Sequence, residues 1–108
     1  RELASLHAYS SAQQRPLVIS EYGFPVLSSA ASRPWDETTG ADFDPQLQVE
    51  LLEQALAALQ AAPPQAHFLW NWFGTGSADE ASFTPRGRPA AHVLRQAFDS
   101  SPLRDSSP

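Results

Sequence analysis

The sequence has no cysteine, no methionine and no lysine, and each absence narrows what the protein can be. Without cysteine there is no disulfide framework, no thiolate metal site and no cysteine nucleophile. The 7 basic residues, all arginine, are outnumbered by 12 acidic ones, and the net charge of −5 argues against a nucleic-acid partner. No apolar run approaches the roughly 20 residues of a membrane span, so we expect no integral membrane protein.

The missing methionine bears on where the chain begins. The chain opens at Arg1 inside a stretch with a helical pattern, so we expect the 108 residues to be a piece of a longer protein. They fit at most one small domain. We assign residues 1–98 to part of one α/β domain and residues 99–108 to a solvated C-terminal tail. No localisation follows, because a signal peptide would stand before Arg1.

Helical and strand-like stretches alternate along the chain. Asp44-Pro45 predicts a helix start, with Asp as the cap and Pro at the first helical position. Strands that alternate with helices predict parallel pairing, and long loops after parallel strands carry the chemistry of (β/α) barrels. The expected elements are a helix over 1–14, a strand over 17–20, a helix over 45–62, a strand over 67–73 and a helix over 89–98. The apolar stripe of the middle helix is expected at Leu47, Leu51, Ala55, Leu59 and Ala62, widened by Leu52 and Leu56.

Glu21 is the most informative residue of the chain. It closes a short apolar strand and lies beside Ile19 and Tyr22, where a carboxylate is costly unless it is hydrogen-bonded or paired. Such a position suits a functional carboxylate. A strand-end Glu that faces solvent or pairs with an arginine explains it equally well.

Three tryptophans are candidates for binding a ligand. Trp70 and Trp72 are two residues apart, so on a strand they would share one face and could stack on the apolar face of a sugar ring. Core packing between sheet and helix is the more common role for such a pair. Trp35 lies in a long loop and is harder to explain as core, which makes it a candidate lid or subsite residue.

Other chemistry-bearing residues form no recognisable motif. The three histidines lack metal-ligand spacing, and no serine lies in a nucleophile elbow. Gly74-Thr75-Gly76 lacks the further residues of a phosphate-binding loop, and we interpret Asp79-Glu80 as a solvated acidic turn. We therefore expect no metal site.

Several motifs together resemble a known family of enzymes. The stretch PLVISEYGF, residues 16–24, is similar to strand seven of the clan A retaining glycoside hydrolases, and FLWNW, residues 68–72, resembles their strand eight. Further similarity lies in Arg33-Pro34-Trp35, in Gln48 and in FTPRGRPA, residues 83–90. In this order the motifs look most like glycoside hydrolase family 113, the endo-β-1,4-mannanase type, or a close cellulase-like relative. The resemblance implies no cofactor, since retaining glycoside hydrolysis uses carboxyl groups alone. The resemblance covers roughly residues 15–98.

The resemblance implies a fold and a site. The chain would be the C-terminal part of a (β/α)8 TIM barrel: the end of helix six, strand seven, helix seven, strand eight and helix eight. Glu21 would be the nucleophile, and Trp70 with Trp72 would line the −1 sugar subsite. Tyr22 or Asn71 would hydrogen-bond the sugar or Glu21.

The resemblance also implies that one catalytic group is absent. A retaining mechanism needs a second carboxyl about 5–5.5 Å from the first, and in clan A that Glu follows an Asn. Asn71 is the only asparagine here, and Trp72 follows it. We therefore expect a parent enzyme that acts on β-linked glycans, either mannan or glucan, whereas the 108 residues alone would be inactive. We also expect them to be poorly stable alone, because open sheet edges would self-associate or require the missing barrel portion.

Two other hypotheses stay open. In the first, the chain belongs to a non-catalytic, barrel-derived carbohydrate-binding or structural module that keeps the aromatic platform. In the second, it is a small α/β interaction domain unrelated to sugars, which would leave Glu21, Trp70 and Trp72 unexplained as a set.

Overall fold

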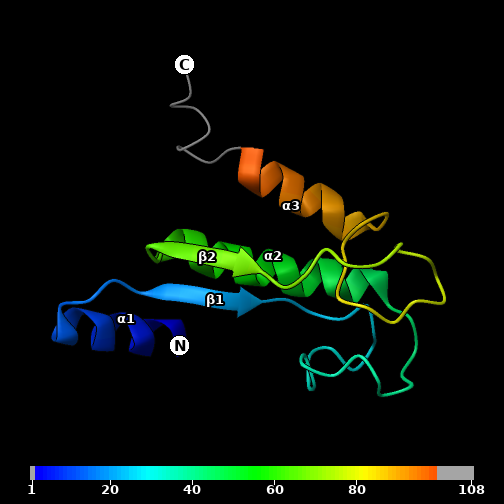
Figure 1. The fold of residues 1–108 in the computed structure, drawn as a ribbon, viewed down its shortest axis with the longest axis horizontal. Coiled ribbons are helices and arrows are strands. Elements are labelled where there is room, and N and C mark those ends of the chain that lie inside the picture. Colours follow the sequence, from blue (N-terminus) through cyan, green and yellow to red (C-terminus); the bar gives the residue numbers. More distant parts are fainter. Residues whose placement is uncertain (1, 100–108) are drawn as a thin grey trace.

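Helices and strands alternate through the chain in the expected order. The computed structural model describes residues 2–99, and Figure 1 shows their arrangement. The elements within them are α1 (Glu2–Gln13), β1 (Val18–Tyr22), α2 (Pro45–Ala61), β2 (Ala66–Leu69) and α3 (Pro89–Asp99). Helix α3 includes Asp99, and the other residues of the expected tail, 100–108, lie outside the described part of the chain. No helix within residues 2–99 has the length and apolar character needed to cross a membrane.

The two strands form a parallel sheet, as predicted. β1 and β2 are neighbours, with Val18 opposite Ala66 and Tyr22 opposite Leu69. Helix α2 forms the crossover between them, which makes a βαβ unit. Both strands point toward the end of the molecule from which the loops 23–44 and 70–88 leave (Figure 1). Residues at these strand ends and in these loops are therefore available to form one site.

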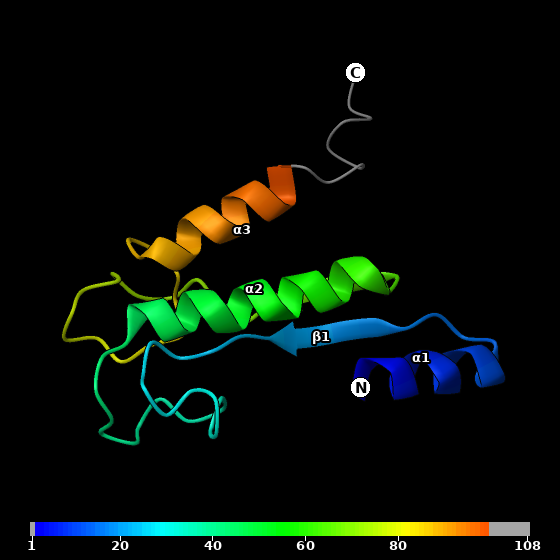
Figure 2. The same cartoon turned by 180° about the vertical axis from the view of Figure 1, so that it is seen from behind.

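The helices cover one face of the sheet. Seen from behind, α2 lies in front of the sheet and hides β2 (Figure 2). The core between α2 and α3 consists of Val49, Leu52, Leu56, Ala90 and Leu94, and Tyr22 and Leu69 of the sheet pack against it. The buried face of α2 therefore runs through Val49, Leu52, Leu56 and Leu59. Of the predicted apolar positions, Leu52, Leu56 and Leu59 are buried, whereas the others, Leu47, Leu51, Ala55 and Ala62, are only partly buried. The buried face differs because α2 is packed both by the sheet and by α3.

Local hydrogen bonds and backbone geometry explain two helix ends. The carboxylate of Asp44 accepts a hydrogen bond from the amide of Leu47 at 3.0 Å, and Pro45 begins α2, so the predicted start is confirmed. Helix α1 ends where Gln14 takes a left-handed conformation with φ 55° and the amide of Arg15 bonds to the carbonyl of Ser10. His7 of α1 donates from Nε2 to the carbonyl of Ala62 after α2, which ties these two helices together.

The second strand is shorter than the sequence pattern suggests. β2 ends at Leu69, so the strand predicted over 67–73 is wrong beyond that residue. The amide of Trp70 still donates to the carbonyl of Tyr22 at 2.8 Å, but β1 ends at Tyr22 and offers no further partner. Trp70 and Trp72 therefore lie beyond the strand, and their two-residue spacing does not put them on one face of a sheet.

A buried glutamine joins helix α2 to the loops at the end of the sheet. Gln48 is 0 % exposed, and its Nε2 donates to the carbonyls of Phe24 and Phe83, each at 3.1 Å. The carbonyl of Thr84 lies 3.5 Å from the same nitrogen. Because a buried carbonyl without a donor costs roughly 1–3 kcal/mol, Gln48 stabilises both loops against the helix.

This contact predicts a sharp effect of an isosteric substitution. Gln48→Glu replaces the donating nitrogen by an oxygen that faces carbonyl oxygens, so we expect the free energy of unfolding to fall by about 3 kcal/mol or more. Chemical denaturation followed by circular dichroism measures this loss. Gln54→Glu is the matched control, since Gln54 lies on the exposed side of the same helix. Equal midpoints for the two variants would show that Gln48 does not hold the loops.

Candidate functional site

A pocket opens at the carboxyl ends of the two strands. Its volume is about 460 Å³. Its lining comes from the end of β1, from Trp70 just after β2, and from both long loops. The lining residues are Glu21, Tyr22, Gly23, Pro34, Trp35, Glu37, Trp70 and Phe83. The pocket therefore combines carboxylates with aromatic rings.

An irregularity in β1 sets the direction of Glu21. The strand pairing is regular at Ile19 and at Tyr22, but three steps along β1 match two steps along β2. Ser20 and Glu21 are both exposed, whereas Ile19 and Tyr22 are partly buried, so the alternation of faces is interrupted. Such an extra residue is a β-bulge, which redirects side chains. The bulge leaves Glu21 exposed and turns Tyr22 toward the helices.

Tyr22 contacts both the pocket and the helical layer. Its hydroxyl shares a hydrogen bond of 3.0 Å with Nδ1 of His67, and its ring lies 5.3 Å from the His67 ring. The His67 ring in turn stacks on Phe98 of α3 at 6.3 Å. Burial raises the pKa of the Tyr22 hydroxyl above its ordinary value. This hydroxyl is therefore neutral at physiological pH, and its described partner is His67.

Two of the three candidate tryptophans line the pocket. Trp35 is 70 % exposed and Trp70 is 45 % exposed, so both offer ring surface to a ligand. Trp35 is supplied by the loop after β1 and Trp70 by the first position after β2. Large aromatic faces left exposed in a pocket suit stacking on an apolar surface. The structure thus brings Glu21, Tyr22, Trp35 and Trp70 together.

Asn71 and Trp72 are not among the residues that line the pocket. The peptide bond between Trp70 and Asn71 is cis. Oδ1 of Asn71 accepts a hydrogen bond of 3.0 Å from the amide of Phe73, so this side chain holds its own turn. Trp72 is half exposed, and β2 ends three residues before it.

The pocket also includes residues that the sequence patterns did not single out as site residues. Glu37 adds a second carboxylate and Phe83 a further aromatic ring. Gly23 lies where an added Cβ would come within 1.8 Å of the carbonyl oxygen of Trp70, so only glycine allows β1 to approach Trp70 this closely. In the sequence, only its position two residues after the candidate Trp35 could have indicated that Glu37 lines the pocket.

The loop that carries Trp35 and Glu37 is anchored at its base. Leu27 and Phe43 form an antiparallel bridge, and Val26 and Leu27 are buried. The amide of Asp44 donates to the carbonyl of Val26 at 2.8 Å. Farther along, the hydroxyls of Ser29 and Thr39 lie 2.9 Å apart. The two ends of this loop are therefore held together by hydrogen bonds, and its tip lines the pocket.

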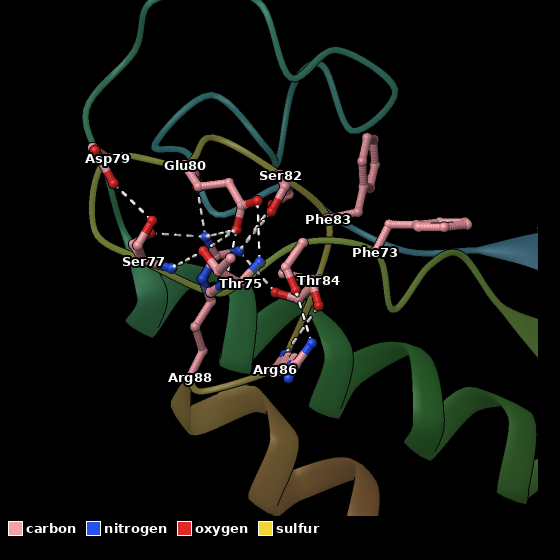
Figure 3. Close-up of polar contacts among 12 residues, drawn as sticks. Phe73, Thr75, Ser77, Asp79, Glu80, Ser82, Phe83, Thr84, Arg86 and Arg88 are labelled. Atoms are coloured by element: carbon pink, nitrogen blue, oxygen red, sulfur yellow. Dashed lines mark hydrogen bonds and ion pairs between the residues drawn. The ribbon is translucent and has the colours of Figure 1, made fainter.

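The second loop is organised around Arg88 and Glu80 (Figure 3). Arg88 is 5 % exposed and donates to the carbonyls of Ser77, Glu80, Ser82 and Thr84. Its guanidinium also lies 5.5 Å from the ring centre of Phe43, in the base of the first loop. Burial lowers the pKa of Arg88, and the charge of Glu80 opposes that shift. One buried cation thus connects both loops that line the pocket.

Glu80 is bound by backbone amides, which corrects its interpretation as a solvated turn. Its carboxylate accepts hydrogen bonds from the amide of Gly76 at 2.7 Å and from that of Thr75 at 3.2 Å. An added Cβ on Gly74 would come within 2.4 Å of the same carboxylate. These glycines allow the loop to close around an anion, and the anion is the chain's own Glu80. Asp79 fits the expected acidic turn better, since its side chain is exposed and bonds to the hydroxyl of Ser77.

Within residues 2–99, no group of three or more His, Cys, Asp or Glu side chains is placed to hold a metal ion. The pocket itself offers the carboxylates of Glu21 and Glu37 and the surrounding aromatic rings.

Comparison with known proteins places the fold. No family model and no curated protein matches the chain. Among solved structures, a complex of a GH113 β-1,4-mannanase matches 94% of this chain with a TM-score of 0.83 at 18% identity. A second GH113 β-1,4-mannanase structure matches 92% with a TM-score of 0.81, also at 18% identity. The GH113 β-mannanase AaManA from Alicyclobacillus acidocaldarius, in complex with ManMIm, matches 90% with a TM-score of 0.71 at 26% identity.

These matches confirm the resemblance to glycoside hydrolase family 113 in fold. The chain is an α/β structure with parallel strands, similar to a portion of a GH113 TIM barrel. It spans about a third of the length of the solved structures it matches, between 33% and 35% of each.

The close approach at Gly23 yields a prediction for the pocket. Gly23→Ala forces the end of β1 away from Trp70, so we expect a loss of about 1–3 kcal/mol of stability and a shifted tryptophan fluorescence spectrum. Thermal unfolding and emission spectra measure the two effects. Ser20→Ala is the control, since Ser20 is exposed on the same strand. If Gly23→Ala behaves like Ser20→Ala, the approach of β1 to Trp70 is looser than described.

The environment of Glu80 predicts a dependence of stability on pH. Hydrogen bonds from the amides of Gly76 and Thr75 lower the pKa of Glu80 from its ordinary value of 4.5. The unfolded chain therefore binds this proton more readily than the folded one, so the stabilisation is complete above pH 4.5 and is lost as pH falls through the lowered pKa. We expect Glu80→Gln to lose less thermal stability than the wild type on acidification from about pH 7 to about pH 3.

Thermal midpoints at both pH values test this expectation. Glu53→Gln is the control, because Glu53 is exposed on α2 and should leave the wild-type dependence intact. Hydrogen bonds also lower the pKa values of Asp36 and Asp79, so some dependence will remain in every variant. An identical acid response of Glu80→Gln and wild type would contradict the stabilising role of the bound carboxylate.

Proposed function

We propose that this chain forms the nucleophile-bearing part of a retaining glycoside hydrolase that acts on β-linked glycans, mannan or glucan. The observation that carries the proposal is the position of Glu21, at the end of a parallel strand and in one pocket with Trp35 and Trp70. The fold similarity to GH113 β-mannanases supports it. Strand ends of this kind are where barrel enzymes carry their catalytic groups.

In this proposal each element has a place in the barrel. Helix α1 is the end of helix six, β1 is strand seven, α2 is helix seven, β2 is strand eight and α3 is helix eight. The sheet of the described residues has two strands, so each strand has one edge without a neighbouring strand there. The apolar side chains of Val18 in β1 and Phe68 in β2 are about half exposed. The remaining strands of the barrel, or a second copy of the chain, would cover these edges and side chains.

The proposed chemistry follows from the carboxylate of Glu21. One oxygen of this carboxylate bonds to the anomeric carbon while the bond from that carbon to the leaving oxygen breaks. The leaving oxygen takes a proton from a second carboxylic acid, and water then hydrolyses the glycosyl ester of Glu21. The exposed rings of Trp35 and Trp70 would hold the sugar against Glu21. The chain has no Asn-Glu pair that would supply the acid, so the 108 residues alone would not turn over substrate.

Covalent labelling tests the role of Glu21. The full-length protein is treated with an activated 2-deoxy-2-fluoromannosyl or 2-deoxy-2-fluoroglucosyl inhibitor, and the labelled peptide is identified by mass spectrometry. We expect the label on Glu21, no label in Glu21→Gln, and wild-type labelling in Glu53→Gln. A label on any other residue excludes Glu21 as the nucleophile. Glycan binding without any label would instead favour a non-catalytic carbohydrate-binding module.

A further inference from the structure

The charged side chains that line the pocket are all acidic. Two of its lining residues, Glu21 and Glu37, carry carboxylates, and none of the eight is an arginine or a histidine. The other ionisable group is Tyr22, which burial keeps neutral by raising its pKa. The proposed reaction needs the charge of Glu21 but gives no role to Glu37. The second carboxylate therefore requires its own explanation.

Glu37 lies in an ordered turn of the first loop. The neighbouring Asp36 accepts hydrogen bonds through Oδ1 from the amide of Thr38 at 2.8 Å and from its hydroxyl at 2.6 Å. These bonds bracket Glu37 and fix the backbone on both sides of it. They also lower the pKa of Asp36, which keeps this side chain charged. The turn thus holds Glu37 beside Trp35 at the pocket.

The nearest arginine in the sequence is engaged elsewhere. Nη2 of Arg33 lies 3.2 Å from Oδ2 of Asp36 and forms an ion pair with it. The guanidinium of Arg33 thus compensates Asp36, and among the described residues that line the pocket none is an arginine or a histidine. A ligand in this pocket therefore meets two negative charges together with aromatic rings.

We propose that Glu37 is a specificity-determining residue that accepts hydrogen bonds from sugar hydroxyls and excludes glycans bearing carboxylates. This inference rests on the proposed function, because it concerns the sugar held beside Glu21. Hydrogen bonds from hydroxyls to an ionised carboxylate are strong and short. A uronic acid in the same position brings a third negative charge beside Glu21 and Glu37, and like charges repel. The pocket thus selects neutral β-glycans.

Binding of matched ligands by the full-length protein tests the selectivity. The probes are β-1,4-linked manno- and cello-oligosaccharides with sulfur in place of the glycosidic oxygen, which resist hydrolysis, and the same compounds carrying a carboxylate at C6, titrated calorimetrically. We expect the wild type to bind the neutral member of each pair at least about tenfold more tightly, a difference of about 1.4 kcal/mol. Glu37→Gln should weaken binding of the neutral glycan several-fold and reduce the discrimination. Glu37→Asp, which keeps the charge, should retain the discrimination.

Controls separate this inference from the proposed function. Glu53→Gln removes the same charge from the exposed side of α2 and should bind both ligands like the wild type. Circular dichroism confirms that each variant is folded. Equal affinity of the wild type for neutral and oxidised glycans, or wild-type discrimination in Glu37→Gln, overturns the role of Glu37 and leaves Glu21 untouched. If the wild type binds neither kind of glycan, the proposed function itself fails, and the selectivity fails with it.

Discussion

Gln48 donates hydrogen bonds from one buried amide nitrogen to the carbonyls of Phe24 and Phe83, which lie in different loops at the end of the sheet. Both loops contribute to the pocket, so their relative position depends on a side chain that does not itself line it. Arg88 extends this arrangement, because its guanidinium binds four carbonyls of one loop and lies over Phe43 at the base of the other. Buried donors, more than regular pairing, thus set the geometry of the site.

The β-bulge in β1 divides neighbouring residues between two tasks. Without the extra residue, strict alternation would turn Glu21 toward the helices and Tyr22 away from them. With it, Tyr22 packs on the helical core and bonds to His67, whereas Glu21 lines the pocket. Gly23 follows directly and lets the strand end approach the carbonyl of Trp70. Three consecutive residues therefore serve three purposes: Glu21 lines the pocket, Tyr22 packs on the helical core, and Gly23 allows the close approach to Trp70.

The sequence predicted those features that depend on local chemistry. Asp44-Pro45 marked the start of α2 because capping acts within one turn, and the order of elements followed from apolar runs and prolines. The end of β2 could not be predicted, because it depends on where β1 stops offering partners. The β-bulge in β1 could not be predicted from the sequence either, because a bulge is defined only by how two strands pair. Glu80 and Glu37 are acidic loop residues in sequence, and only the folded loops distinguish a carboxylate bound by amides from one at a pocket.

The loop that carries Trp35 and Glu37 is closed at its base by the bridge between Leu27 and Phe43. Its buried residues Pro25, Val26, Leu27 and Ala30 all lie before the tip, and the helical core contains none of the tip residues. Mutations at the tip therefore remove no contact of the helical core. The tip of such a loop can therefore vary independently of the rest of the fold. Natural variation or directed evolution can alter the residues presented to a ligand while the sheet and helices that carry Glu21 are left unchanged.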